Sequence, residues 1–260
     1  MRAGDTGVEV DRDEALTGRE GFSGLDEAPD TVEAPEPVEA SEPVEAPETG
    51  EDAPDPRLAE FLDLPSRYVH PSWFEELEHG EVLAGLRDVA RVERPLSRLL
   101  SRALGLGEAA PGDTAGLDLG VHLLGPAALE TLVERLGLSL ASPQVRAVLD
   151  GPSARALREA LGEEGYAFAV GHAALLVDDA ALRNVPRLDP EAPRESVRSL
   201  GMAALALYCV DYPAALNARL GLKLPRPWSR RRSLPALLLE GGTLRPLVLR
   251  LVREQSGVRG

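Results

Sequence analysis

The fold class is indicated most clearly by residues 126–137, which read PAALETLVERLG. Apolar side chains recur there three, four and seven residues after Leu129, which places them on one face of an α-helix. Proline is tolerated in the first turn of a helix, and glycine often adopts the left-handed conformation just beyond the last turn. We therefore predict an amphipathic helix that begins at Pro126 and ends before Gly137.

The segment that follows is predicted to form two more short helices. The first is expected to be capped by Ser142, to begin at Pro143 and to end at Gly151. Its inward face is expected to consist of Val145, Val148 and Leu149. The second helix is expected to be capped by Ser153 and to end before Gly162.

Helical spacing of apolar residues recurs along the rest of the chain. Helices are predicted at residues 82–90, 96–104, 193–211, 214–220 and 244–252, and a buried helix or apolar turn at residues 164–177. The aromatic-rich segment at residues 57–77 is expected to be ordered but irregular, because Pro65 and Pro71 prevent one continuous helix. Since no segment alternates polar and apolar residues with a period of two, we predict an all-α fold.

Charge divides the chain into parts. Residues 1–56 carry 18 acidic and 3 basic side chains, whereas residues 57–260 carry 25 of each. The first segment is also rich in proline and poor in large apolar residues, so it cannot bury enough apolar surface to offset the entropy of ordering. We predict a disordered acidic tail at residues 1–56, one helical domain at residues 57–255 and a C-terminal tail at residues 256–260. The acidic tail is either a solvated spacer or a docking segment for a basic partner.

The sequence contains no recognisable catalytic or metal-binding motif. Its four histidines lack the i, i+4 spacing of a helical metal site, and Cys209 is the only cysteine, which excludes zinc sites built on cysteine pairs. Lys223, the only lysine, follows no GxxxxG frame, which excludes a P-loop nucleotide site. The longest apolar run, residues 202–210, is too short to span a membrane, and the first residues form no apolar leader. We therefore expect a non-enzymatic, cytoplasmic protein without cofactor or metal.

Basic residues gather toward the C-terminus, where residues 219–260 carry ten basic and two acidic side chains. Trp228 lies there among Arg226, Arg230, Arg231 and Arg232. Such a basic turn is compatible with an acidic protein partner, nucleic acid, an anionic lipid surface, the chain's own acidic tail or simple solvation. The helices predicted at residues 143–150 and 153–161 are similar to a helix-turn-helix. A helical nucleic-acid-binding or regulatory protein is therefore the alternative function.

Five motifs in succession resemble a known family. They are RYVHPSW at residues 67–73, LLGPAALETLVERLGL at 123–138, VLDG at 148–151, LGEEGYAFA at 161–169 and RLGLKLP at 219–225. Their order, across residues 62–255, resembles that of the SctK proteins, also named YscK, PscK, MxiK or OrgA. These are cytosolic accessory proteins of bacterial type III secretion systems. The acidic tail departs from the short N-terminus typical of the family.

The resemblance implies an α-helical, non-enzymatic adaptor in the cytoplasmic sorting platform of the secretion apparatus. There the family links the cytosolic domain of the inner-membrane ring protein SctD to the SctQ pods, without nucleic acid or membrane insertion. Arg67, Tyr68 and Trp73 are candidate contacts for one partner, because aromatic residues and arginine are enriched at interfaces. A buried position for Trp73 is the alternative. The basic turn around Trp228 is the candidate contact for an acidic partner.

Overall fold

A computed structural model of the chain describes residues 55–229, 234–239 and 242–255. The chain divides into two units, residues 1–51 and 52–260. All the described residues belong to the second unit.

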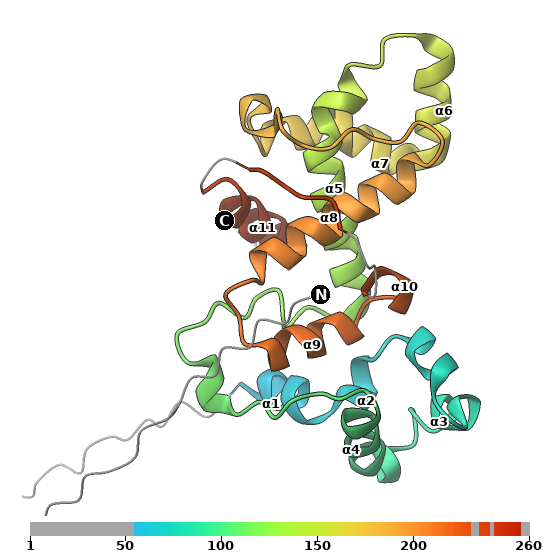
Figure 1. The fold of residues 1–260 in the computed structure, drawn as a ribbon, viewed down its shortest axis with the longest axis vertical. Coiled ribbons are helices and arrows are strands. Elements are labelled where there is room, and N and C mark those ends of the chain that lie inside the picture. The colour runs from blue at the N-terminus through green and yellow to red at the C-terminus, as the bar shows by residue number, and fades with distance from the viewer. Residues whose placement is uncertain (1–54, 230–233, 240–241, 256–260) are drawn as a thin grey trace, which may run out of the picture. The chain divides into compact units, whose positions relative to one another are not determined.

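The regular elements of the described ranges are all helical, with no strand among them, so the predicted all-α fold is confirmed (Figure 1). The α-helices are α1 (Pro56–Asp63), α2 (Pro65–Tyr68), α3 (Gly80–Gly85), α4 (Glu93–Ala103), α5 (Pro126–Arg146), α6 (Gly151–Leu161), α7 (Glu163–Ala167), α8 (Pro193–Tyr208), α9 (Ala214–Leu222), α10 (Arg226–Ser229) and α11 (Leu244–Gln255). The shorter 3-10 or π turns are η1 (Pro71–Glu76), η2 (Ala90–Val92), η3 (Pro111–Thr114), η4 (Phe168–His172), η5 (Ala173–Leu175) and η6 (Asp179–Leu182).

Prolines divide the aromatic-rich segment into short helices, as the sequence predicts. Pro56, Pro65 and Pro71 each lie in the first turn of a new element, namely α1, α2 and η1. The carboxylate of Asp55 accepts a hydrogen bond of 2.9 Å from the backbone N–H of Arg57 and so caps α1. Apart from Asp55 and Pro56, the predicted acidic tail lies outside the described residues, as does the predicted C-terminal tail.

The prediction that a helix ends before Gly137 is wrong, because α5 continues through Gly137 and Pro143 to Arg146. Pro143 has no N–H group and cannot donate the usual backbone hydrogen bond inside the helix. Tertiary contacts hold this last turn instead. The hydroxyl of Ser142, for example, donates a hydrogen bond of 2.7 Å to the carbonyl oxygen of Ala169. A local pattern of glycine and proline therefore does not end a helix that packs along its whole length.

Helices α5 and α8 cross near the middle of Figure 1, and Gly137 on α5 lies against Val197 on α8. A Cβ atom added to Gly137 would lie 1.9 Å from the carbonyl oxygen of Val197 on α8. A Cβ atom added to Gly201 on α8 would lie 1.9 Å from the carbonyl oxygen of Val133 on α5. The two glycines therefore allow the two backbones to approach closely, and Gly137 serves a helix crossing rather than a helix end.

The start of α6 also differs from the prediction. Asp150, and not Ser153, caps this helix, because the Asp150 carboxylate accepts a hydrogen bond of 2.8 Å from the backbone N–H of Ser153. Gly151 begins α6 instead of ending the preceding helix, and Leu149, predicted to face inward, is 92% exposed. Residues 143–146 are the last turn of α5, so the helix-turn-helix interpretation loses its separate first helix.

The other predicted helices agree with the structure except at residues 82–90. That segment is divided between α3 and η2, and Val82 is exposed. The predictions at residues 96–104, 193–211, 214–220 and 244–252 correspond to α4, α8, α9 and α11. Residues 164–177 follow a helical path through α7, η4 and η5.

Two apolar clusters form the interior. The first surrounds the α5–α8 crossing and includes Leu129, Leu136, Leu140, Leu200, Val248 and Leu251. The second lies among α1, α2, η1 and α4 and includes Phe61, Tyr68, Trp73, Phe74, Leu96 and Leu100. Helix α9 contributes to both, since Leu220 belongs to the first cluster and Leu216 to the second. This helix therefore couples the packing of the two clusters.

Candidate functional site

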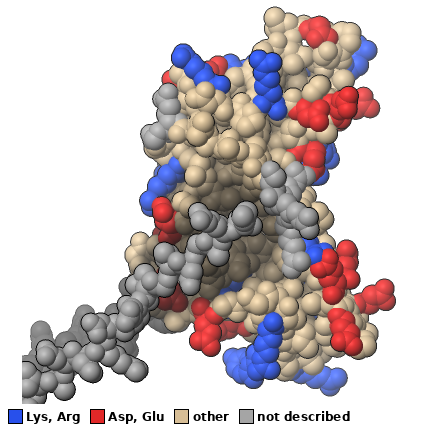
Figure 2. Space-filling model, in the orientation of Figure 1, with Lys and Arg blue, Asp and Glu red and all other residues tan. Residues whose placement is uncertain are grey.

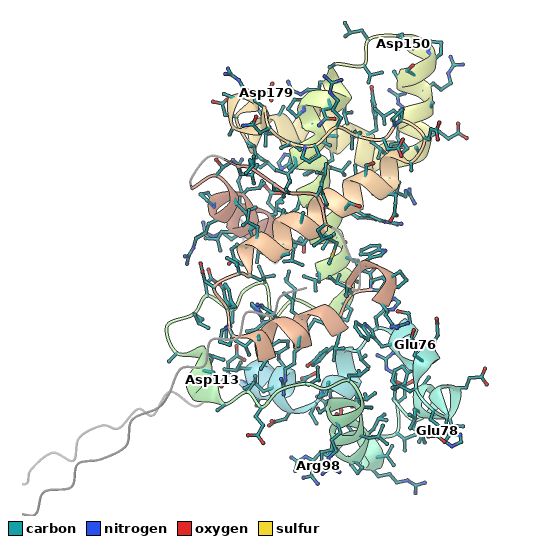
Figure 3. The ribbon with its side chains drawn as sticks, in the orientation of Figure 1. Glu76, Glu78, Arg98, Asp113, Asp150 and Asp179 are labelled. Atoms are coloured by element: carbon teal, nitrogen blue, oxygen red, sulfur yellow. The ribbon has the colours of Figure 1, made fainter. Side chains whose placement is uncertain are left out.

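The aromatic segment and the basic turn singled out from the sequence pack against each other. The indole Nε1–H of Trp73 in η1 donates a hydrogen bond of 3.0 Å to the carbonyl oxygen of Leu224. The backbone N–H of Arg226 donates one of 2.9 Å to the hydroxyl of Ser72. The Arg226 guanidinium also forms an ion pair with Glu76, which is labelled in Figure 3. Trp73 and Arg226 thus belong to one seam inside the fold, which joins η1 to residues 224–226.

Tyr68 and Trp73 are buried, at 6% and 8% exposure. The Tyr68 hydroxyl donates a hydrogen bond of 2.7 Å to the carbonyl oxygen of Phe61, and the two rings stack with centroids 5.6 Å apart. Burial raises the pKa of the Tyr68 hydroxyl above its ordinary value. Trp73 therefore takes the buried position that the sequence left as the alternative to an interface contact, and both rings pack in the second apolar cluster.

Arg67 lies on the surface but already has carboxylate partners. Its guanidinium pairs with Glu60, at 3.1 Å, and with Glu93. The hydrogen bond to Glu93 is the largest of the effects that raise the pKa of Arg67. Because both carboxylates come from the same chain, this arginine ties α2 to α1 and to the start of α4.

Trp228 is half-buried in α10, and the Arg198 guanidinium lies over its ring at 4.8 Å from the centroid. The ring also lines a small, mostly apolar pocket of about 260 Å³ together with Cys209 and Val210. Of the aromatic residues predicted from the sequence to contact a partner, Trp228 is partly exposed, whereas Tyr68 and Trp73 are buried. Arg230, Arg231 and Arg232 lie outside the described residues.

Lys223 forms a buried polar centre. The sequence analysis used this residue only to exclude a P-loop nucleotide site and did not predict its burial. Its ammonium group donates hydrogen bonds of 2.5 Å and 2.7 Å to the carbonyl oxygens of His122 and Leu124. It also lies over the rings of Phe61 and Tyr68, at 4.6 Å and 5.0 Å from their centroids. Burial lowers the pKa of Lys223 to about 8. This side chain therefore joins α9 to α1, α2 and the loop before α5.

Two other buried polar side chains surround this centre. The Arg219 guanidinium donates hydrogen bonds to the carbonyl oxygens of Leu62, Gly107 and Ala215, at 3.1 Å, 2.8 Å and 3.1 Å. Burial lowers the pKa of His122 to about 4, so its ring is neutral near pH 7. Arg219 and His122 are therefore both interior residues, and neither side chain is presented to a partner.

A groove of about 740 Å³ lies between α1 and α4. Arg94, Arg98 and Arg102 line its α4 wall, and Glu60 and Asp63 lie on the α1 wall. Figure 2 shows basic side chains gathered at the lower edge of the view, where α4 lies in Figure 1. These three arginines are absent from the sequence-based prediction, although their four-residue spacing, which places them on one helix face, is visible in the sequence.

Within the described part of the chain, no group of three or more His, Cys, Asp or Glu side chains is placed to hold a metal ion. Burial raises the pKa of the Cys209 thiol to about 12, which keeps it protonated and unreactive. Among the helices of the described ranges, none has the length and apolar character needed to cross a membrane.

Comparison with known proteins identifies relatives for nearly the whole described region. The family described as YOP proteins translocation protein K (YscK) matches residues 59–257. Among solved structures, the chain is similar to the cytoplasmic domain of the type III secretion system sorting platform protein PscK from P. aeruginosa. The two share 23% sequence identity and a TM-score of 0.47, over 77% of this chain and 95% of the other. No curated protein matches the chain.

Proposed function

This chain belongs to the YscK family, and on that premise we propose that it is a non-enzymatic adaptor in the sorting platform of a bacterial type III secretion system. It would act in the cytoplasm, at the cytosolic face of the secretion apparatus. It would join the cytosolic domain of an SctD-like inner-membrane ring protein to an SctQ-like pod protein, and so support protein secretion. The family match over residues 59–257 is the observation that carries the proposal.

The chemistry of the described residues supports an adaptor rather than an enzyme. Lys223 and Arg219 direct their charged groups at backbone carbonyl oxygens of the same chain. The His122 ring and the Cys209 thiol are buried. The charged groups of Lys223 and Arg219 therefore serve here to join elements of the fold, and the His122 and Cys209 side chains lie in its interior.

The basic turn is the contact that we propose for one of the two partners. Trp228 presents a partly accessible ring, and Arg230, Arg231 and Arg232 follow it in the sequence. An aromatic ring beside several arginines fits an acidic protein surface, because complementary charge speeds association and sets orientation. Arg226 is less suited to this role, since it already pairs with Glu76.

The proposed function is tested by co-expressing the full chain with each partner separately, followed by size-exclusion chromatography. We expect co-elution with the SctD-like cytosolic domain and with the SctQ-like protein. The triple variant R230E/R231E/R232E is expected to lose one partner and keep the other. Its matched control is R155E/R183E/R187E, which changes the net charge equally at three arginines elsewhere in the chain, each of them exposed.

The adaptor proposal is refuted if the wild-type chain elutes alone from both partners. Retention on DNA that weakens with salt would favour the nucleic-acid alternative instead. Loss of one partner in the control as well as in the R230E/R231E/R232E variant would show that net charge alone, and not the basic turn, governs binding.

A further inference from the structure

The solvent-facing side of α4 carries two parallel rows of side chains. The basic row consists of Arg94, Arg98 and Arg102, and the apolar row of Pro95, Leu99 and Ala103. All six residues are exposed, with Leu99 at 43%. The opposite side of the helix buries Leu96 and Leu100 in the second apolar cluster. The fold therefore fixes α4 in place and presents both rows to the outside; Figure 3 shows Arg98 projecting outward.

The arginines of the basic row lack partners in the part of the chain that the structure describes. None of the three forms an ion pair or a side-chain hydrogen bond with a described residue. Arg67 nearby pairs with carboxylates, and Arg219 at the base of the groove is bound by carbonyl oxygens. The basic row thus has unused donor capacity, with five N–H donors on each guanidinium.

The spacing of the two rows defines what would fit them. Residues four apart in a helix are separated by about 6 Å along its axis, so each row has a repeat of that length. A second helix with acidic residues at i, i+4 and i+8 has the same repeat. If apolar residues lie beside its acidic ones, they would meet Leu99 and Ala103 while its carboxylates meet the arginines.

We propose that this face of α4 binds an acidic amphipathic helix of a protein partner. The inference rests on the proposed adaptor function and adds a second contact surface to the basic turn. A protein helix fits better than nucleic acid because of the apolar row. Leu99 and Ala103 offer apolar surface that the side chains of an amphipathic helix would cover, whereas a phosphate backbone would not use it.

The test compares the full-length triple variant R94E/R98E/R102E with the wild-type chain and with the R155E/R183E/R187E control. Each protein is titrated separately against the SctD-like cytosolic domain and the SctQ-like protein by isothermal calorimetry. Circular dichroism melting confirms that each variant is folded. We expect the α4 variant to bind one partner at least about tenfold more weakly and the other partner normally, because three attractive contacts become repulsive.

Two further variants separate the contributions of the two rows. R94Q/R98Q/R102Q removes the charges without reversing them and is expected to weaken binding less than the glutamate variant. L99N leaves the charges intact and is expected to weaken binding of the same partner without changing its dependence on salt. The salt dependence itself should be shallower in the glutamine variant than in the wild-type chain.

Several outcomes overturn the proposal. Equal affinity of the wild-type chain and the α4 variant for both partners would exclude the face as a partner site. Binding of a 20-base-pair DNA duplex by the wild-type chain but not by the α4 variant would assign the face to nucleic acid. Concentration-dependent self-association that the α4 variant abolishes would assign it to a second copy of the chain. If the wild-type chain binds neither partner, the adaptor function itself fails, which is distinct from failure of the α4 face alone.

Discussion

Replacing Gly137 by alanine should separate the two helices at the centre of the larger apolar cluster. The new Cβ atom would lie 1.9 Å from the carbonyl oxygen of Val197. To restore an ordinary contact, α5 and α8 would have to move apart by about 1.5 Å. Overpacking of this kind costs roughly 1–3 kcal/mol and sometimes more, whereas alanine gains about 1 kcal/mol over glycine in helix propensity. Because a backbone oxygen cannot rotate away, we expect a cost at or above the upper end of that range, and therefore a net loss of about 2 kcal/mol or more in the free energy of unfolding.

The assay is urea denaturation of the full chain followed by circular dichroism, with thermal melting as a second measure. A loss of 2 kcal/mol corresponds to a fall of about 4–8 °C in Tm for a body of this size. Gly85→Ala is the matched control, because Gly85 also lies in a helix and a Cβ atom added there would meet nothing within 4 Å. This control should be neutral or slightly more stable than the wild-type chain.

Gly201→Ala makes the reciprocal clash with Val133 and should cost about as much as Gly137→Ala. One separation of the helices relieves both clashes, so the double variant should lose less than the sum of the two single losses. If Gly137→Ala is as stable as Gly85→Ala, the two backbones do not approach closely at this crossing, and the explanation given for the continuity of α5 is refuted.

The remaining predictions concern one buried and one exposed charge. Lys223→Met should lower the free energy of unfolding by about 2 kcal/mol at pH 7, because the carbonyl oxygens of His122 and Leu124 lose their donor; urea denaturation measures this. The stability difference between the wild-type chain and this variant should grow as the pH rises from about 8 to 10. Over that range Lys223 is protonated in the unfolded chain, which has the ordinary lysine pKa, but has lost its proton in the folded chain, so the free energy of unfolding of the wild-type chain rises with pH. A stability difference that does not change with pH would contradict this. Asp150→Ala should lower Tm by removing the cap at Ser153, and the effect should fade at acidic pH, since that hydrogen bond holds the pKa of Asp150 below its ordinary value.

Helices could be predicted from the sequence wherever the deciding interactions are local. The three- and four-residue spacing of apolar side chains gave the positions of α4, α8 and α11, and the prolines gave the breaks between α1, α2 and η1. Gly137 shows the limit of such reasoning. A glycine that ends a helix and a glycine at a helix crossing look alike in the sequence, because Val197 is far away along the chain.

The candidate site was predicted less well for the same physical reason. Tyr68 and Trp73 have the composition of an interface anchor, but whether their rings are covered depends on Phe61 and on the distant residue Leu224. The sequence does carry one signal for Lys223, since a lone charged residue in the apolar sequence GLKLP must either be solvated or find partners. No local rule identifies those partners as two carbonyl oxygens in the loop before α5.

Arginine density in the sequence therefore indicates where charge lies, but not which guanidinium groups are available to a partner. Arg226 belongs to the most basic stretch of the chain, yet it pairs with Glu76 from η1. An acidic partner would have to displace that carboxylate, and the exchange of one ion pair for another gains little. Arg98 lies in a less basic segment but has no carboxylate partner among the described residues, so a new ion pair there adds to those already present. If the chain is the proposed adaptor and its partners present acidic surfaces, the pairing of each arginine within the fold is thus a better guide to the interface than the count of arginines, and it favours the exposed face of α4.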